Sequence, residues 1–88
     1  MEIDYTDEAL EHLKFWKKSG NKTIQKKIIN LLNDIVINPF SGIGKPEELK
    51  YEWSGYWSRR INQEHRIIYK IEKDRILIYS LKGHYNNY

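Results

Sequence analysis

The 88-residue chain contains no cysteine and no long apolar run, and each absence excludes a class of protein. Without cysteine, the chain cannot form a disulfide framework, a thiolate zinc site or a cysteine nucleophile. No apolar stretch approaches the roughly 18 residues of a membrane span, and the N-terminal residues lack the basic flank and apolar segment of a signal peptide. Repeats, linkers and low-complexity segments are also absent from the sequence. A cytoplasmic protein with no membrane association is therefore expected.

The composition is that of one small folded domain. Hydrophobic residues make up 40% of the chain and aromatic residues 14%, which is enough for one compact core and argues against disorder. Chains of this length seldom divide further, so residues 1–88 are expected to form a single domain. Lysine and arginine number 15 against 12 acidic residues, and the net charge of +3 permits a polyanionic partner without requiring one.

Two helices are predicted in the first half of the chain, after a short strand at residues 2–5. Thr6 can cap the first helix and Gly20 can end it. The second helix should end at Asn38, because the residue before a proline is pushed out of the helical conformation. Both segments have apolar residues at helical spacing: Ala9, Leu10, Leu13 and Trp16 in the first, and Ile24, Ile28, Leu31, Leu32 and Ile35 in the second. The pattern predicts a helical hairpin whose apolar face packs on a sheet.

Four strand-forming runs follow the glycine-rich loop at residues 41–46. They are EELKYEW (47–53), YWSRRI (56–61), RIIYKI (66–71) and RILIYSL (75–81), with turn-forming residues between them. Connections this short leave no room for crossover helices, so the runs predict an antiparallel meander. The expected fold class is α+β, in which a short N-terminal strand and a two-helix hairpin accompany a mainly antiparallel twisted sheet, with the hairpin packed on one of its faces.

Two of these runs place cations among strand-forming residues. If five residues rather than four connect the two strands, Arg60 lies across from Arg66. The face of this pair then also holds Ser58, Ile68 and Lys70, and the opposite, core face holds Trp57, Ile67, Tyr69 and Ile71. Arginines directly across a ladder repel each other, so the arrangement is favoured if an anion normally sits between them. The sequence therefore predicts one core face and one cationic face.

The stretch PFSGIGKPEELKYEWSGYWSRRINQEHRIIY (39–69), together with His84 and Tyr85, resembles the Txe/YoeB toxins of the RelE superfamily. The resemblance covers essentially the whole chain, because the helical hairpin, GKPE loop, WSRRI strand, EHR turn and terminal His-Tyr occur in order and at the usual spacing. It implies a RelE-like, microbial-ribonuclease-like fold. It also implies the toxin of a type II toxin-antitoxin pair, an endoribonuclease that cuts messenger RNA in the ribosomal A site with no metal ion and no cofactor.

The same resemblance implies the partners. They are the ribosome and its mRNA, and a YefM/Axe-like antitoxin that neutralises the toxin. Operator DNA would be bound only through the antitoxin, and a homodimer is compatible with the family. An antitoxin that blocks a cationic groove should present an acidic segment that is disordered alone and folds on binding.

The family's catalytic set carries over onto Glu47, Arg66 and His84, and the chemistry needs these residue types. RNA cleavage without a metal requires a base for the 2′-hydroxyl proton, an acid for the departing 5′-oxygen and a cation for the phosphorane. Glu47 fits the base. His84 fits the acid, because an imidazole with a free pKa of about 6.5 donates at neutral pH more readily than a lysine at about 10.4. Arg66 fits the phosphate clamp, because a guanidinium stays charged and can hold two nonbridging oxygens.

Supporting roles are implied for three further residues. By resemblance, Lys50 and Arg60 add positive charge beside the phosphate, and Tyr85 stacks on or positions the substrate. The chain departs from the family at its end, where residues 86–88 follow the His-Tyr pair. This tail could crowd the RNA or extend into solvent, and it leaves Tyr85 without the terminal carboxylate.

The other two histidines have simpler structural explanations. His65, in the turn beside Arg66, is expected to satisfy a backbone group, with contact to the RNA as the alternative. His12 lies one turn after Glu8, but no third metal ligand is evident nearby, so a solvated helix face is expected.

Aromatic residues and helical lysines are also explained most simply by structure. Trp57 is expected in the core, whereas Trp53 and Tyr56 stay undecided between packing and RNA stacking. The helical lysines are expected on the solvated side of the hairpin, with ribosomal RNA as the alternative contact.

Two other functions remain open from the residues alone. One is a catalytically silent co-repressor that acts through an antitoxin, and the other is a plain RNA-binding module. A binding module has no need for Glu47, since a carboxylate in a phosphate site repels its ligand. Glu47 therefore favours the enzyme.

Overall fold

The structure, a computed structural model, describes residues 1–83. Its helices confirm the predicted hairpin, and neither helix in this range is long and apolar enough to cross a membrane. The elements are β1 (Glu2–Tyr5), α1 (Asp7–Ser19), α2 (Lys22–Ile37), β2 (Glu47–Glu48), the 3-10 helix η1 (Tyr51–Trp53), β3 (Trp57–Arg60), β4 (Arg66–Glu72) and β5 (Arg75–Ser80).

The helix ends follow from local side-chain and backbone chemistry. Thr6 caps α1, because its hydroxyl oxygen accepts a hydrogen bond from Ala9 N–H at 3.1 Å. Gly20 ends α1 in a left-handed conformation with φ 70°. Asn38 leaves the helical conformation at the end of α2, directly before Pro39, as the sequence predicts.

The five strands form one sheet in the order β1-β5-β4-β3-β2. β1 runs parallel to β5, and the other three neighbouring pairs are antiparallel. The first and last strands therefore lie side by side, although the helical hairpin and the meander separate them in sequence. This confirms the α+β class with a mainly antiparallel sheet.

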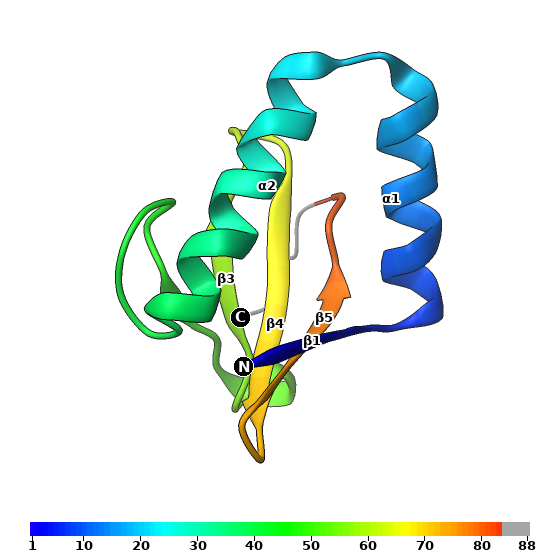
Figure 1. The fold of residues 1–88 in the computed structure, drawn as a ribbon. Coiled ribbons are helices and arrows are strands. Elements are labelled where there is room, and N and C mark those ends of the chain that lie inside the picture. Colours follow the sequence, from blue (N-terminus) through cyan, green and yellow to red (C-terminus); the bar gives the residue numbers. More distant parts are fainter. Residues whose placement is uncertain (84–88) are drawn as a thin grey trace.

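Both helices cover the same face of the sheet (Figure 1). The apolar stripes of α1 and α2 meet the inward residues of the strands, and Trp57 packs against this core as predicted. Burying each isoleucine or leucine contributes about 1.5–3 kcal/mol, so this layer is the main source of stability. The buried members are Ala9, Trp16, Ile24, Ile28, Leu31, Ile35, Ile61, Ile67, Tyr69, Ile76, Ile78 and Leu81.

The run at residues 47–53 was expected to be one strand, and this expectation is wrong beyond Glu48. Leu49 N–H donates to Tyr56 O at 2.9 Å, which closes a tight reversal before β3 begins. Tyr51 lies inside this reversal with φ 57°, a backbone conformation that no strand contains. The strand-forming residue types are therefore overridden by the need to turn the chain within a few residues.

Candidate functional site

Arg60 and Arg66 are directly opposed on β3 and β4, which confirms the predicted register. Ile67 and Tyr69 belong to the helix-covered core, so alternation along β4 turns Arg66 to the other face of the sheet, away from the helices. We call this the open face because Arg60 and Glu47 are exposed on it, although Ser58 and Ile68 on the same face are buried. Arg60 is exposed, whereas Arg66 retains 8% of its surface exposed. Like charges directly across a ladder are unfavourable, and an anion between the two guanidinium groups would relieve the repulsion.

Glu47 lies on the same open face, close to the arginine pair. It pairs with Ser58 across β2 and β3, and Ser58 precedes Arg60 by two residues on β3. Residues in this diagonal relation have Cα atoms about 7–8 Å apart, within reach of long side chains. Because Glu47 is exposed, a solvent-accessible carboxylate lies on the same face as the two arginines, diagonal to Arg60 and one strand further from Arg66.

The turn before β4 holds the Arg66 guanidinium in place. Its Nη1 donates to the carbonyl oxygens of Asn62 at 2.8 Å, Gln63 at 3.3 Å and His65 at 3.3 Å. The Asn62 side-chain oxygen stiffens the turn by accepting from the backbone N–H groups of Glu64 (2.9 Å) and His65 (2.8 Å). Within residues 1–83 no acceptor is bonded to Nε or Nη2 of Arg66. Nη1 of the guanidinium is therefore anchored, and Nε and Nη2 can donate to an anion.

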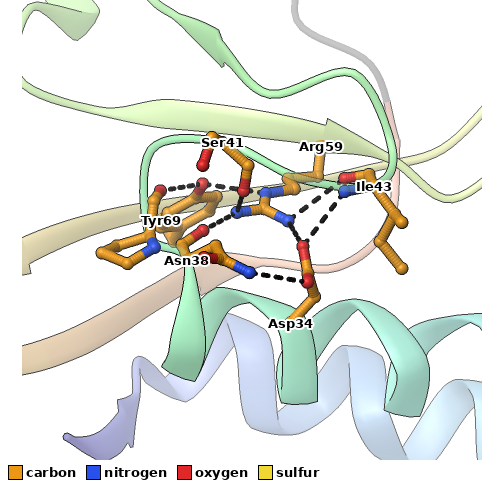
Figure 2. Close-up of polar contacts among 7 residues, drawn as sticks. Asp34, Asn38, Ser41, Ile43, Arg59 and Tyr69 are labelled. Carbon is orange, nitrogen blue, oxygen red and sulfur yellow. Dashed lines mark hydrogen bonds and ion pairs between the residues drawn. The ribbon is translucent and has the colours of Figure 1, made fainter.

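Arg59, on the same strand as Arg60, is fully buried on the helix-covered side (Figure 2). Its Nη1 donates to Asp34 of α2 and to Ile43 O at 3.1 Å. Its Nη2 donates to Asn38 O and to Ser41 O, the second at 2.8 Å. Ser41 lies in the loop that follows α2. One buried guanidinium thus fastens this loop to both α2 and β3.

Asp34 and Tyr69 complete the network. The Arg59 hydrogen bond holds the pKa of the Asp34 carboxyl below its usual value, and the Ile43 N–H, which donates to Asp34 at 3.0 Å, adds to this effect. Arg59 Nε donates to the Tyr69 hydroxyl oxygen at 3.1 Å, and that hydroxyl donates to Pro39 O at 2.7 Å. Burial raises the pKa of Tyr69, which keeps the phenol neutral and able to donate.

The loop fastened by Arg59 leads directly to Glu47. Arg60 N–H donates to Gly44 O at 2.7 Å, so the loop also docks on the end of β3. Gly44 has φ 79°, a left-handed conformation that favours glycine, and a Cβ there would lie 2.6 Å from a methyl carbon of Leu31, so that the leucine side chain would have to shift. Arg59 is therefore a structural residue that determines where the strand carrying Glu47 begins.

The described part of the chain does not bring the other three predicted site residues together with Glu47, Arg60 and Arg66. Lys50 is exposed at the N-terminal cap of η1, and no hydrogen bond or ion pair in residues 1–83 ties it to the arginine pair. His84 and Tyr85 lie outside the described residues, as does the 86–88 tail, so their roles stay predictions.

An aromatic cluster borders the open face. Trp53 lies edge to face with Tyr56 and Tyr79, with ring centroids 5.2 and 5.0 Å apart. The Lys70 ammonium lies 5.1 Å from the Tyr56 ring centroid, and Lys70 alternates with Arg66 on the same side of β4. The rings pack on one another, which favours the packing alternative for Trp53 and Tyr56.

The two described histidines both bind backbone groups. For His12 the predicted solvated position is wrong, since its side chain is 18% exposed and its Nδ1 accepts Leu81 N–H at 3.0 Å. His65 has the expected structural contact, because its Nδ1 accepts Gly83 N–H at 3.0 Å. The partner of His12 lies 69 residues away in the sequence, so no local pattern could have identified it.

The open face thus presents a carboxylate next to paired cations. A carboxylate can act as a proton acceptor, and guanidinium groups bind phosphate oxygens with directed hydrogen bonds. The arrangement suits proton transfer on an anionic ligand held against the sheet.

Comparison with known proteins gives full-length matches. The family model described as a YoeB-like toxin of bacterial type II toxin-antitoxin systems matches residues 5–85. The toxin YoeB of Streptomyces coelicolor is 44% identical over 97% of this chain and 100% of its own length. The YoeB/ParE toxin from Agrobacterium tumefaciens has a TM-score of 0.92 and 34% identity, and the match covers 97% of this chain and 100% of that chain. The toxin in a heterotetrameric YoeB-YefM complex from Staphylococcus aureus has a TM-score of 0.86 and 43% identity, covering 97% of this chain and 98% of that chain.

The fold and these matches define the class, which is the toxins of bacterial type II toxin-antitoxin systems with a RelE-like fold. Within that class, the chain belongs to the YoeB-like toxin family, as its sequence motifs indicate.

Proposed function

We propose that this toxin is an endoribonuclease that cleaves messenger RNA in the ribosomal A site, without a metal ion, by attack of the 2′-hydroxyl on the adjacent phosphate. The observation that carries the proposal is the position of Glu47 on the same face as the opposed Arg60 and Arg66, diagonal to Arg60. A surface that only bound RNA would gain nothing from this carboxylate, because like charges repel at close range. A base next to a phosphate clamp is what the 2′-hydroxyl reaction requires.

In the proposed reaction each proton has a named carrier. Glu47 takes the proton of the 2′-hydroxyl as its oxygen attacks phosphorus, and His84 gives a proton to the departing 5′-oxygen. Arg66, anchored through Nη1, holds nonbridging oxygens and stabilises the charge of the phosphorane. The products are a 2′,3′-cyclic phosphate and a 5′-hydroxyl.

The supporting roles follow from charge and position. Arg60 adds a second guanidinium directly across from Arg66. Lys50 adds positive charge on the approach to the site, and Tyr85 stacks on or positions the substrate base.

A YefM-like antitoxin is the proposed inhibitor, acting in the cytoplasm where the ribosome is also found. The Staphylococcus aureus relative that forms a complex with YefM supports this assignment. The antitoxin should cover the cationic open face with an acidic segment that folds on binding, and operator DNA is then bound through the antitoxin. Hydrogen exchange should show protection of β3 and β4 in the complex. Protection confined to the lysine-rich sides of α1 and α2 would contradict this placement.

Primer-extension mapping on ribosomes that carry a translated message tests the reaction. Wild-type toxin should cut at A-site codons, and Glu47→Ala and His84→Ala should each reduce cleavage by about 10²–10⁴-fold, the usual contribution of general acid-base catalysis. Glu48→Ala is a matched control, because Glu48 is an exposed neighbour on β2 that points to the other side of the strand. It should cut like wild type.

A second substrate separates this reaction from other routes of cleavage. A message with a 2′-deoxy nucleotide at the scissile position should stay intact, because the attacking hydroxyl is missing. Cleavage of that message would refute the 2′-hydroxyl mechanism. If wild type and variants all leave the normal message intact while they bind antitoxin, the chain is a regulatory protein rather than a nuclease.

A further inference from the structure

The backbone that follows β5 is fastened by two histidine side chains from distant parts of the fold. Leu81 N–H donates to His12 Nδ1 on α1 at 3.0 Å. Two residues later, Gly83 N–H donates to His65 Nδ1 in the turn before β4, also at 3.0 Å. Residues 81–83, which we call the terminal strap, are therefore attached both to α1 and to the turn before β4.

Trp16 and Arg66 reinforce these contacts. The Trp16 indole N–H donates to Leu81 O at 2.9 Å, and the indole ring packs edge to face on the His65 ring with centroids 4.9 Å apart. The Arg66 backbone N–H donates to Gly83 O at 3.1 Å. Both ends of the strap thus have their N–H and C=O groups paired.

Both imidazoles must be neutral and protonated on Nε2 in order to accept at Nδ1. For His12, burial lowers the pKa and favours this neutral form. Glu8, 3.9 Å from Nε2, opposes the effect, and the positive charge of nearby Lys82 adds to it. If either acceptor were lost, a backbone N–H of the strap would lose its partner, which costs free energy in a buried position.

One turn connects the strap to the phosphate clamp. The carbonyl oxygens of Asn62, Gln63 and His65 hold the Arg66 guanidinium, and the His65 side chain holds the strap. Gly83, which His65 anchors, is the residue directly before His84. The same rigid turn therefore fixes both Arg66 and the point from which the chain continues to His84.

We propose that His65 and His12 are positioning residues. As neutral acceptors they fix the terminal strap and thereby set the position, relative to Arg66, of Gly83, from which the chain continues to His84. The catalytic consequence rests on the proposed function, in which His84 is the proton donor. The anchoring itself does not depend on RNA cleavage. A catalytic group displaced by about 1 Å can lose about 10²-fold in rate, so the anchors should affect catalysis without touching RNA.

Nuclear magnetic resonance of the full-length chain tests the anchoring directly. Nitrogen-nitrogen couplings across the hydrogen bonds should connect the Gly83 amide to His65 and the Leu81 amide to His12. His65→Phe keeps a ring against Trp16 but removes the acceptor, so amide exchange at Gly83 should accelerate by at least about tenfold, as for an opened hydrogen bond. His65→Asn keeps an acceptor near the Nδ1 position and should preserve the protection of Gly83. Equal Gly83 protection in wild type and His65→Phe, or no coupling in wild type, would overturn the inference.

Cleavage kinetics on ribosomes test the consequence. His65→Phe should lower kcat by about 10–100-fold with KM changed by no more than about twofold, because the loss is of position rather than of binding. His65→Asn should recover most of kcat. A wild-type kcat in His65→Phe overturns the positioning role.

Folding is checked by thermal unfolding of each variant. If His65→Phe does not fold, His12→Phe and His12→Asn give the same comparison at Leu81. If wild-type toxin cleaves no RNA, the proposed function fails, and the couplings and amide exchange still decide whether the histidines anchor the strap.

Discussion

Arg59 and Arg60 are adjacent residues of the same type on one strand, yet their environments are opposite. Arg59 is fully buried, and Asp34, Tyr69 and three backbone carbonyls accept its hydrogen bonds. Arg60 is exposed and faces Arg66 across the ladder. Because side chains alternate between the faces of a strand, a step of one residue moves a guanidinium from a saturated hydrogen-bond network to the solvent-exposed face of the sheet. The face of the sheet, not the residue type, separates the structural arginine from the one available to a ligand.

The largest expected effect comes from making the same substitution at both positions. Arg59→Met leaves Asp34 without its cation and the loop carbonyls without donors, so the free energy of unfolding should fall by about 3–5 kcal/mol. Arg60→Met removes an exposed side chain with a repulsive neighbour and should change that free energy by no more than about 0.5 kcal/mol. Urea unfolding measures both values. Similar losses at the two positions would mean that the network around Arg59 does not stabilise the fold.

For RNA binding, the order of the two effects should be reversed, with the larger effect at Arg60. Arg60→Gln should weaken binding of a short single-stranded RNA and reduce the slope of log affinity against log salt by about 0.7, because one phosphate contact is lost. Fluorescence anisotropy at several salt concentrations gives both quantities. Lys22→Gln, which removes an exposed cation at the start of α2, is the matched control and should leave the slope unchanged. The same slope for Arg60→Gln and wild type would remove Arg60 from the binding site.

The smallest expected effect is a change in folding stability at acidic pH. Because the Arg59 hydrogen bond lowers the pKa of Asp34 below its ordinary 3.8, ionised Asp34 stabilises the folded chain. This stabilisation is fully present above the unfolded-state pKa and is lost as the pH falls through the lower folded-state pKa. Asp34→Asn cannot ionise, so the stability difference between wild type and this variant should narrow below a pH of about 4. Chemical unfolding at a series of pH values measures the difference, and a constant gap would show that the charge of Asp34 is not involved.

Local signals in the sequence were sufficient for most of the fold. Thr6, Gly20 and the Asn38-Pro39 step define helix ends through contacts within a few residues, and these predictions are confirmed. The pairing of Arg60 with Arg66 was predicted on the condition that five residues rather than four connect the two strands, and the structure meets this condition. The run at residues 47–53 was misassigned because strand propensity competes with chain reversal, and propensity is the weaker of the two.

Part of the candidate site could also be predicted from the sequence. Glu47, Arg60 and Arg66 lie on one face, as family motifs and strand alternation together indicate. The buried role of Arg59 was missed, although alternation places it on the core face, where an arginine requires an anionic partner. That partner, Asp34, lies 25 residues earlier. The roles of His84 and Tyr85 stay predictions.

By itself the sequence determined what depends on neighbours along the chain: the two amphipathic helices, their caps, the meander and the side of the strand on which each arginine lies. Only the tertiary structure decided which groups the buried side chains bind, including Asp34 for Arg59 and the terminal strap for His12 and His65. The physical reason is that a hydrogen bond requires atoms about 3 Å apart. Such proximity between residues far apart in sequence exists only after the helical layer has packed on the sheet.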